Sequence, residues 1–248
     1  MIDSLRIVLV GTQHPGNIGS AARAMKTMGL QRLSLVAPER FPHAEAFALA
    51  AGANDVLEAA QIHPTLESAL AGCHMVVATT ARRRTVPMPE LTPPEAARRL
   101  LADAEHGEVA LVFGRERTGL ENEELQLCHA SVSIPANPEY SSLNLAAAVQ
   151  VLAYELRVAA LSAQPLPAMA TPADPDELPA SFEAMEGFFG HLGQLLDDID
   201  FHKGRSPDMV TQRLRRLFLR ARPDPRELRI LRGIFSDTQR LLGARREP

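Results

Sequence analysis

The stretch ALVFGRERTGL, residues 110–120, sets an apolar run directly before a glycine and a series of alternating charges. The apolar run predicts a short buried strand, and Gly114 would let a ligand approach the backbone where this strand ends. Glu116 stands between two arginines, so we expect an ion-pair network around it. The alternative interpretation is a charged surface loop, in which such pairs contribute little to stability. The stretch therefore predicts a strand that leads into a candidate binding loop.

The same alternation of short apolar runs with Ala- and Leu-rich stretches continues through the first 160 residues. The expected strands span residues 6–10, 32–36, 75–79, 110–113 and 130–134. The expected helices span residues 20–28, 44–51, 65–71, 93–104, 122–128 and 142–160. Because the strands are almost continuously apolar and alternate with helices, they predict an α/β fold whose parallel sheet is covered by helices on both faces.

A proline-rich segment divides the chain after this block. Residues 163–181 contain five prolines, which predicts an extended linker rather than a packed element. Helical periodicity returns in residues 182–198, 207–219 and 224–243. Ser206 precedes a proline that suits the first helical turn, so we expect it to cap the second of these helices. The expected organisation is a first domain of residues 1–162, the linker 163–181 and a small helical extension of residues 182–248.

Charge is distributed unevenly between these parts. The chain carries 26 basic and 30 acidic residues, a formal net charge of −4, which by itself suggests no polyanionic partner. Residues 200–248, however, hold thirteen basic and six acidic residues and have a net charge of +7. Twelve of the thirteen are arginine, whose planar guanidinium suits bidentate contacts to phosphate. The tail is therefore either a solvated helical surface or a phosphate-binding one.

Composition and targeting patterns exclude several classes of protein. Cys73 and Cys128 are too few for a disulfide framework or a cysteine-rich zinc site, and they indicate a reducing compartment. The chain begins without a signal-peptide pattern and no run approaches eighteen apolar residues, so we expect a soluble cytoplasmic protein with no membrane partner. Because the chain has no Trp and two Tyr, we do not expect an aromatic platform for stacking single-stranded bases.

A glycine-punctuated loop, VGTQHPGNIGSAAR at residues 10–23, follows the first expected strand. It lacks the Gly-Lys-Ser/Thr of a P-loop and the glycine spacing of a dinucleotide fingerprint, yet it leads into a helix start that could hold a phosphate. Asn17 and Arg23 could face one ligand from this helix, or the segment is a plain turn with a surface arginine. His14 is expected to be a loop residue, because no partner stands at metal-ligand spacing.

Two further loops follow expected strands. IPANPEYSSLNL, residues 134–145, brings Ser141 and Ser142 to a helix start, where the serines are most simply caps. One face of the helix that follows is apolar and carries Leu143, Ala147, Val151 and Tyr154. TTARRR, residues 79–84, indicates an anionic substrate or a solvated basic turn. Since ligands bind at the carboxyl ends of parallel strands, all these loops predict one shared site.

Taken in order, three of these segments resemble the motifs of a known family. NIGSAARAM at residues 17–25, LVFGRERTGL at 111–120 and IPANPEYSSLNLAAAVQVLAYEL at 134–156 are similar to motifs one, two and three of the TrmH-like branch of the SPOUT methyltransferases. The resemblance is close over residues 5–160, whereas the tail matches in size and helical character only. TTARRR and the detached tail are most similar to the members that methylate the ribose 2′-hydroxyl of cytidine or uridine at position 32 of tRNA.

The resemblance implies a fold, a cofactor and partners. It implies the SPOUT fold, in which the C-terminal segment of the parallel-sheet domain is threaded into a trefoil knot, and it implies a homodimer. It implies S-adenosylmethionine as methyl donor, tRNA as substrate bound in part by the basic helical extension, and no required metal. Three alternatives stay open: 2′-O-methylation of another tRNA or ribosomal RNA site, a non-catalytic RNA-binding protein on the same scaffold, and an enzyme that binds a nucleotide at its first loop.

The resemblance also assigns residues by position. The donor-binding residues would be Thr79, Thr80, Ala81, Gly114, Ile134, Ser141, Ser142 and Leu143. The polar active-site residues would be Asn17, Arg23, Glu116, Ser142 and Asn144. The RNA-binding residues would be Arg23, Arg82, Arg83, Arg84 and Arg115. Because a guanidinium does not deprotonate in proteins, we expect Arg23 to grip a phosphate and stabilise the developing alkoxide, while the phosphate or Ser142 helps to move the proton.

Overall fold

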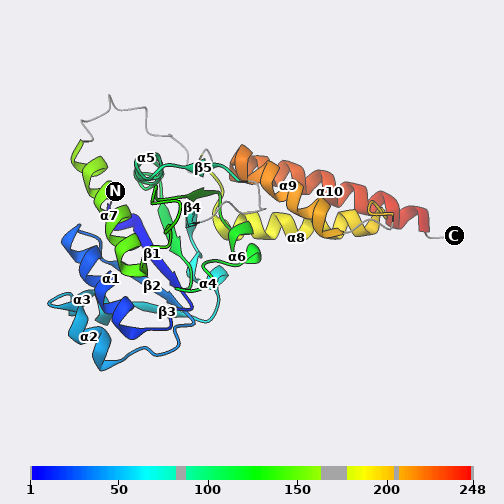
Figure 1. Ribbon diagram of the computed structural model, residues 1–248. Helices are drawn as coiled ribbons and strands as arrows, with labels where there is room; N and C mark the ends of the chain where they lie inside the picture. Colours follow the sequence, from blue (N-terminus) through cyan, green and yellow to red (C-terminus); the bar gives the residue numbers. More distant parts are fainter. Residues whose placement is uncertain (1, 82–87, 163–177, 204–206, 247–248) are drawn as a thin grey trace. The chain divides into compact units, whose positions relative to one another are not determined.

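A computed structural model describes residues 2–81, 88–162, 178–203 and 207–246 of the protein, with side chains up to residue 242. Contacts between residues divide the chain into two compact units, Met1–Pro167 and Ala168–Pro248. Within the described residues, the first unit contains a sheet and its covering helices, and the second is helical (Figure 1).

A seven-stranded parallel sheet forms the centre of the first unit. Its strands are β1 (Leu5–Val10), β2 (Arg32–Val36), β3 (Gln61–His63), β4 (Cys73–Thr79), β5 (Glu90–Leu91), β6 (Glu108–Phe113) and β7 (Ala130–Val132). Their order is β3-β2-β1-β6-β4-β7-β5, and every pair of neighbours is parallel. The predicted parallel α/β sheet is confirmed, and all five predicted strands are present. The edge strands β3 and β5 were not predicted, because three and two residues carry too little apolar pattern to be recognised.

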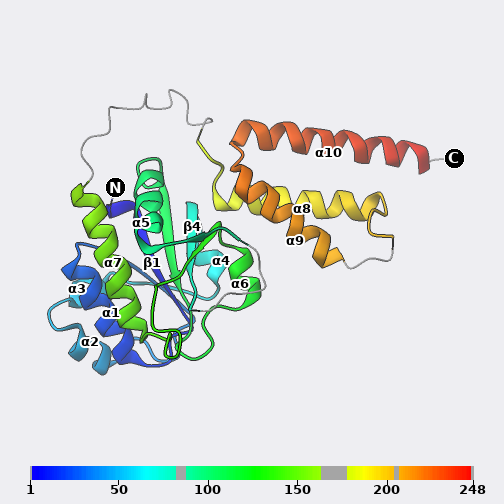
Figure 2. The same ribbon diagram turned by 45° about the horizontal axis from the view of Figure 1, so that its top comes forward.

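In the part of the first unit that the structure describes, seven α-helices cover this sheet. They are α1 (Pro15–Thr27), α2 (Ala44–Ala50), α3 (Asn54–Glu58), α4 (Leu66–Ala69), α5 (Pro93–Asp103), α6 (Asn122–Gln126) and α7 (Leu145–Ser162). Figures 1 and 2 show α1 and α7 on one side of the sheet and α4 and α6 on the other. All six residues of β1 are buried between these layers, so the core of the unit lies around this strand. The short helix α3 was not predicted.

Helix α1 begins earlier than the sequence predicts. It starts at Pro15, whereas the expected start was residue 20. Proline suits a first helical turn, but the glycines that follow it are weak helix formers and obscure the pattern. Gly19 is required by packing, because a Cβ atom there would lie 2.0 Å from the carbonyl oxygen of Ala46 in α2. The early start places Asn17 in the first turn of α1.

Helix α7 also begins differently from the prediction. It starts at Leu145, and the side chain that caps it belongs to Asn144, whose Oδ1 accepts a hydrogen bond of 2.9 Å from the N–H of Ala146. The predicted caps, Ser141 and Ser142, lie in the loop that precedes the helix. The two serines are therefore available to a ligand rather than committed to the helix end.

The apolar face of α7 that the sequence shows is its outer face. Its buried face is formed instead by Leu145, Val149, Leu152, Ala153 and Leu156. On the outer face, Tyr154 is 53% exposed and Leu161 is 71% exposed. By length and composition α7 is apolar enough to cross a membrane, which sequence analysis did not expect. The core helix of a soluble protein meets the same criterion, and α7 packs against α1 and α5.

The described residues of the second unit form three helices: α8 (Phe182–Asp198), α9 (Pro207–Ala221) and α10 (Pro225–Arg246). All three predicted helices are confirmed. Phe188 is fully buried at the centre of their core, where its ring meets those of Phe218 from α9 and Phe235 from α10. The predicted cap Ser206 and most of the predicted linker, residues 163–177, lie outside the described residues.

Candidate active site

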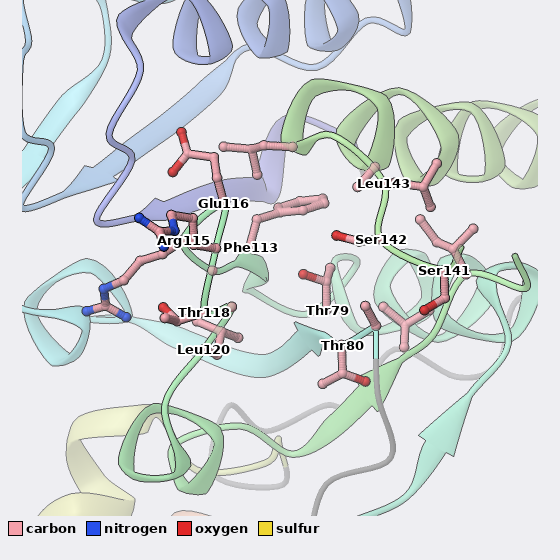
Figure 3. Close-up of a pocket in the computed structure, with 18 residues that line it drawn as sticks. Thr79, Thr80, Phe113, Arg115, Glu116, Thr118, Leu120, Ser141, Ser142 and Leu143 are labelled. Carbon is pink, nitrogen blue, oxygen red and sulfur yellow. The ribbon is translucent and has the colours of Figure 1, made fainter. Parts of the chain in front are cut away.

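A cavity of about 500 Å³ opens at the carboxyl ends of β4, β6 and β7 (Figure 3). Its lining comes from three stretches that are far apart in sequence, within residues 79–81, 113–120 and 132–148. All eight residues predicted to bind the methyl donor line it: Thr79, Thr80, Ala81, Gly114, Ile134, Ser141, Ser142 and Leu143. The loops after these three strands therefore meet in one cavity.

The cavity combines apolar walls with a few hydroxyl groups. Five apolar lining residues were not singled out from the sequence: Phe113, Leu120, Val132, Leu145 and Ala148. Each belongs to a strand, a helix or a motif whose apolar character also suits a core, so the sequence carries no separate signal for a pocket. Figure 3 shows the hydroxyl groups of Thr79 and Ser142 turned into the same part of the cavity. Small-molecule sites span roughly 300–1,000 Å³, so these residues fit a ligand of nucleoside size.

Gly114 is required by the chain's own backbone. A Cβ atom at Gly114 would lie 2.2 Å from the carbonyl carbon of Gly119 and 2.3 Å from the backbone nitrogen of Leu120. The loop between them closes on itself, because Arg115 and Gly119 exchange two backbone hydrogen bonds of 3.2 and 2.9 Å. Sequence analysis expected Gly114 to make room for a ligand. Residues 119–120 fill the space that a Cβ atom would take, while Gly114 also lines the cavity, so its close approach to a ligand stays a prediction.

The carboxylate of Glu116 binds the start of α1. Its oxygens accept hydrogen bonds from the backbone N–H groups of Gln13, at 3.1 Å, and His14, at 3.2 Å. Glu116 Oε1 also accepts a hydrogen bond of 2.9 Å from Asn17 Nδ2. Asn144 Nδ2 in turn donates to Asn17 Oδ1 at 3.1 Å. Three residues predicted to be catalytic are thus joined by hydrogen bonds, with Glu116 on the wall of the cavity.

These hydrogen bonds set the charge of Glu116. Burial alone would raise its pKa, but the hydrogen bonds from Asn17 and from the backbone of Gln13 and His14 outweigh burial and hold the pKa below its ordinary value of 4.5. Glu116 is therefore ionised at neutral pH. The ion-pair network expected around Glu116 is wrong, because the partners of this carboxylate are an amide and two backbone N–H groups rather than arginines.

Arg115 pairs with Glu124 of α6. Its two terminal nitrogens each donate to one carboxylate oxygen of Glu124 at 3.0 Å, and this bidentate pairing raises the pKa of Arg115. Gly11 makes room for the side chain, since a Cβ atom there would lie 2.8 Å from Arg115 Nε. The guanidinium therefore braces the loop that lines the cavity, and its contact with RNA stays a prediction.

Of the other predicted RNA-binding arginines, the structure describes Arg23. Arg23 is exposed on α1, six residues beyond Asn17, and is not among the residues that line the cavity. Arg82, Arg83 and Arg84 lie outside the described residues. His14 occupies the N-cap position of α1 without a side-chain cap bond. In the part of the chain that the structure describes, no group of three or more His, Cys, Asp or Glu side chains could hold a metal ion.

Comparison with family models places the chain. Residues 4–154 match the model described as the SpoU rRNA methylase family. This chain belongs to the SpoU methylase family. The tail of this SpoU methylase, residues 183–247, matches a second model, described as the C-terminal domain of the tRNA methyltransferase TrmJ. The predicted resemblance and the predicted methyltransferase activity are thereby confirmed.

Relatives of this SpoU methylase match it along almost its whole length. The tRNA (cytidine/uridine-2′-O-)-methyltransferase TrmJ of Yersinia pestis (strain Pestoides F) is 54% identical over 241 residues, which are 97% of this chain and 93% of the relative. The protein of the same name from Salmonella choleraesuis (strain SC-B67) is 54% identical over 240 residues, covering 96% and 98% of the two chains. The crystal structure of TrmJ from Z. mobilis ZM4 has a TM-score of 0.79 and 37% identity, covering 94% and 97%.

Proposed function

We propose that this SpoU methylase is a cytoplasmic enzyme that transfers a methyl group from S-adenosylmethionine to the ribose 2′-hydroxyl of cytidine or uridine at position 32 of tRNA. The observation that carries the proposal is the single cavity in which all eight candidate donor-binding residues meet. The names of the relatives support the nucleosides and the tRNA substrate. Position 32 rests on the similarity of TTARRR, residues 79–84, and of the detached tail.

The donor binds in this cavity in our proposal. Apolar walls such as Phe113 and Val132 suit the faces of an adenine ring, and the hydroxyl groups of Thr79 and Ser141 can hydrogen-bond polar groups of the donor. S-adenosylmethionine supplies a methyl group on a positively charged sulfur, which departs with the bonding electron pair as a neutral thioether when the 2′-oxygen attacks the methyl carbon. Because that leaving group is good and neutral, the reaction requires no metal.

What the chain must add is alignment and a path for the hydroxyl proton. Ser142 lines the cavity with its hydroxyl turned inward, so we assign it a part in passing the proton to a phosphate of the RNA (Figure 3). Arg23 lies outside the cavity lining, so we assign it to the RNA phosphate beside the reacting ribose. From there its fixed positive charge stabilises the negative charge that develops on the 2′-oxygen.

A homodimer forms through the outer face of α7 in our proposal. This outer stripe consists of Ala147, Val151, Tyr154, Val158 and Leu161, with spacings that alternate between four and three residues. Such spacing produces a continuous apolar seam along one helix, of the kind that a second helix covers. An isologous dimer lets the same stripe meet its own copy, which covers both with one contact.

Tyr154→Glu is expected to weaken dimerisation by at least about tenfold, because the dimer would bury an unpaired carboxylate at the centre of the stripe. Since Tyr154 is 53% exposed in the single chain, the fold of the protomer should be unaffected. Sedimentation velocity over a concentration series measures the effect. Ile62→Glu on β3 is the matched control, because Ile62 is 55% exposed and lies outside the stripe. A Tyr154→Glu dimer of unchanged affinity would place the interface elsewhere.

The helical extension, residues 182–248, binds tRNA through α9 in our proposal. Arg213, Arg216 and Arg220 fall within one narrow arc of this helix, and within the described residues none of them forms an ion pair. Arg215, by contrast, points into the unit, where it pairs with Glu186 and lies 4.5 Å from the ring of Phe189. Arg215 thus stabilises the helical unit, whereas the other three arginines can bind phosphate.

Replacing Arg213, Arg216 and Arg220 together by alanine is expected to lower the salt dependence of tRNA binding. Each lost phosphate contact should reduce the slope of log K against log salt by about 0.7–0.9, or roughly 2 to 3 in all. Fluorescence anisotropy with labelled tRNA at several salt concentrations measures the slope. Arg240→Ala is the control, because this exposed arginine pairs with Asp237 in α10. An unchanged slope in the triple variant would exclude α9 as the tRNA surface.

Transfer of label from tritiated S-adenosylmethionine to unmodified tRNA, followed by mapping of the methylated nucleotide, tests the proposed function. The expected product carries one 2′-O-methyl group at position 32, and its formation survives a metal chelator. Label at another tRNA position or on ribosomal RNA would replace the substrate proposed here. RNA binding without label would indicate a non-catalytic RNA-binding protein, and activity that requires ATP and Mg²⁺ would indicate a nucleotide-dependent enzyme.

A further inference from the structure

A chain of hydrogen bonds runs in one direction from the start of α7 to Glu116. The N–H of Ala146 donates to Asn144 Oδ1 at 2.9 Å, Asn144 Nδ2 donates to Asn17 Oδ1 at 3.1 Å, and Asn17 Nδ2 donates to Glu116 Oε1 at 2.9 Å. Every step carries a hydrogen toward the carboxylate. The chain links the first, second and third motif segments of the sequence.

The two ends of this chain determine its direction. An ionised carboxylate only accepts hydrogen bonds, so Asn17 must turn its nitrogen toward Glu116 and its oxygen toward Asn144. At the other end the backbone N–H of Ala146 only donates, so Asn144 must turn its oxygen toward α7 and its nitrogen toward Asn17. Neither carboxamide can flip without placing two donors or two acceptors against each other, which costs about 1–3 kcal/mol for each unsatisfied group.

This orientation decides what the two asparagines can bind. Both side-chain oxygens already accept a hydrogen bond within the chain, whereas each nitrogen uses one of its two N–H groups there. Each amide nitrogen therefore keeps one N–H group that it can donate to a ligand. Donors of this kind suit an oxygen that carries negative charge, and they cannot take a proton.

We propose that Glu116 is a positioning residue that holds Asn17 and Asn144 as hydrogen-bond donors toward an anionic oxygen of the RNA substrate. This inference rests on the proposed function, and it deepens that function by removing all three residues from the transfer of the hydroxyl proton. The anionic oxygen belongs either to a phosphate or to the ribose 2′-oxygen as its proton leaves.

The placement of Glu116 supports this role rather than that of a general base. Figure 3 shows its carboxylate turned away from Ser142 and Thr79 and therefore away from the part of the cavity where their hydroxyls meet. Its Oε1 already accepts hydrogen bonds from two backbone N–H groups and from Asn17. A general base works best with a pKa near the operating pH, whereas the pKa of Glu116 is held below its ordinary value.

Glu116→Gln is expected to lower kcat/KM by about a hundredfold, because the new amide sets donors against the N–H groups that now point at the carboxylate. The shape of the pH–rate profile between about pH 6 and 9 should not change, since the carboxylate is ionised throughout that range. Single-turnover rates with unmodified tRNA measure both. Calorimetric titration with S-adenosylmethionine checks that the variant retains its fold and its binding site for the methyl donor.

A paired substitution moves the carboxylate along the chain by one residue. In Glu116→Gln with Asn17→Asp, the amide of residue 116 can donate to the new carboxylate, which can also accept from Asn144. The acceptor end of the chain is thereby restored, although the donor of Asn17 is lost. We expect the double variant to be at least tenfold more active than Asn17→Asp alone, in which two carboxylates face each other, a reversal that additive loss of separate contacts does not produce.

The outcomes separate this inference from the proposed function. Wild-type methylation of tRNA tests the function, whatever the variants do. If the function holds, a double variant no more active than Asn17→Asp alone, or a Glu116→Gln variant that loses one limb of the pH profile, would overturn the positioning role. If the double variant does regain activity, the kinetics of Glu116→Gln identify the anionic oxygen. A raised KM with unchanged kcat assigns the two hydrogen-bond donors to a phosphate, and a lowered kcat with unchanged KM assigns them to the 2′-oxygen.

Discussion

Arg23→Ala is expected to lower kcat by about two to three powers of ten, the size of effect seen when one donor that stabilises a developing oxyanion is removed. The side chain is exposed on α1, so its loss should leave the fold unchanged. Because Arg23 does not line the cavity, the affinity for S-adenosylmethionine should also stay the same. Single-turnover methylation together with calorimetric titration of the donor measures the two effects separately.

Two further variants sharpen the interpretation of Arg23. Arg23→Lys keeps the positive charge but lacks the planar fork, so an intermediate rate is expected if bidentate grip of a phosphate matters. Arg98→Ala, which removes an exposed arginine from α5, is the control for loss of charge alone. Turnover of Arg23→Ala within a few-fold of the wild type would exclude Arg23 from the active-site machinery.

Gly114→Ala is expected to destabilise the first unit by more than about 3 kcal/mol, the upper end of ordinary overpacking. The added methyl group would lie 2.2 Å from the backbone of Gly119, and no side-chain rotation can relieve a clash with backbone. Removing this clash requires the loop 115–119 to open, so binding of S-adenosylmethionine should be lost as well. Thermal unfolding measures the destabilisation, and hydrogen exchange in β6 assigns it to the first unit.

Gly187→Ala in α8 is the matched control for Gly114→Ala. A Cβ atom at Gly187 meets no atom within 4 Å, and the residue lies inside a helix. The substitution should therefore stabilise the helix by about 0.5–1 kcal/mol, as expected from helix propensity alone. If the Gly114→Ala protein were stable and still bound S-adenosylmethionine, the close contact between Gly114 and the backbone of residues 119–120 would not be needed for the cavity.

The candidate site was predictable where one short segment carries the whole signal. The stretches at 79–81, 111–120 and 134–145 were each recognisable as loops after strands, and the eight residues predicted within them to bind the methyl donor line one cavity. The partners of Glu116 were not predictable, because sequence neighbours suggested arginines. Its hydrogen-bond partner Asn17 is 99 residues away along the chain, and no local pattern reports such a contact.

The same distinction applies to the helices and the fold. The helix 182–198 was predicted to the residue because its apolar period is a local property. The start of α1 was misplaced because the glycines that argued against helix are there for close packing against α2. The trefoil knot implied by the family resemblance stays a prediction, since threading leaves no mark in composition or periodicity.

The sequence by itself determined a parallel α/β domain, an arginine-rich helical tail and the motif segments of a methyltransferase, since apolar period, proline content and motif order are local properties. Tertiary structure alone decided that the backbone of residues 119–120 occupies the space beside Gly114, that Arg115 pairs with Glu124, and that the apolar stripe of α7 faces outward. It also decided the direction of the hydrogen bonds from Asn144 through Asn17 to Glu116, across separations of 127 and 99 residues. Hydrogen bonds and packing act through distance in space, which only the folded chain establishes.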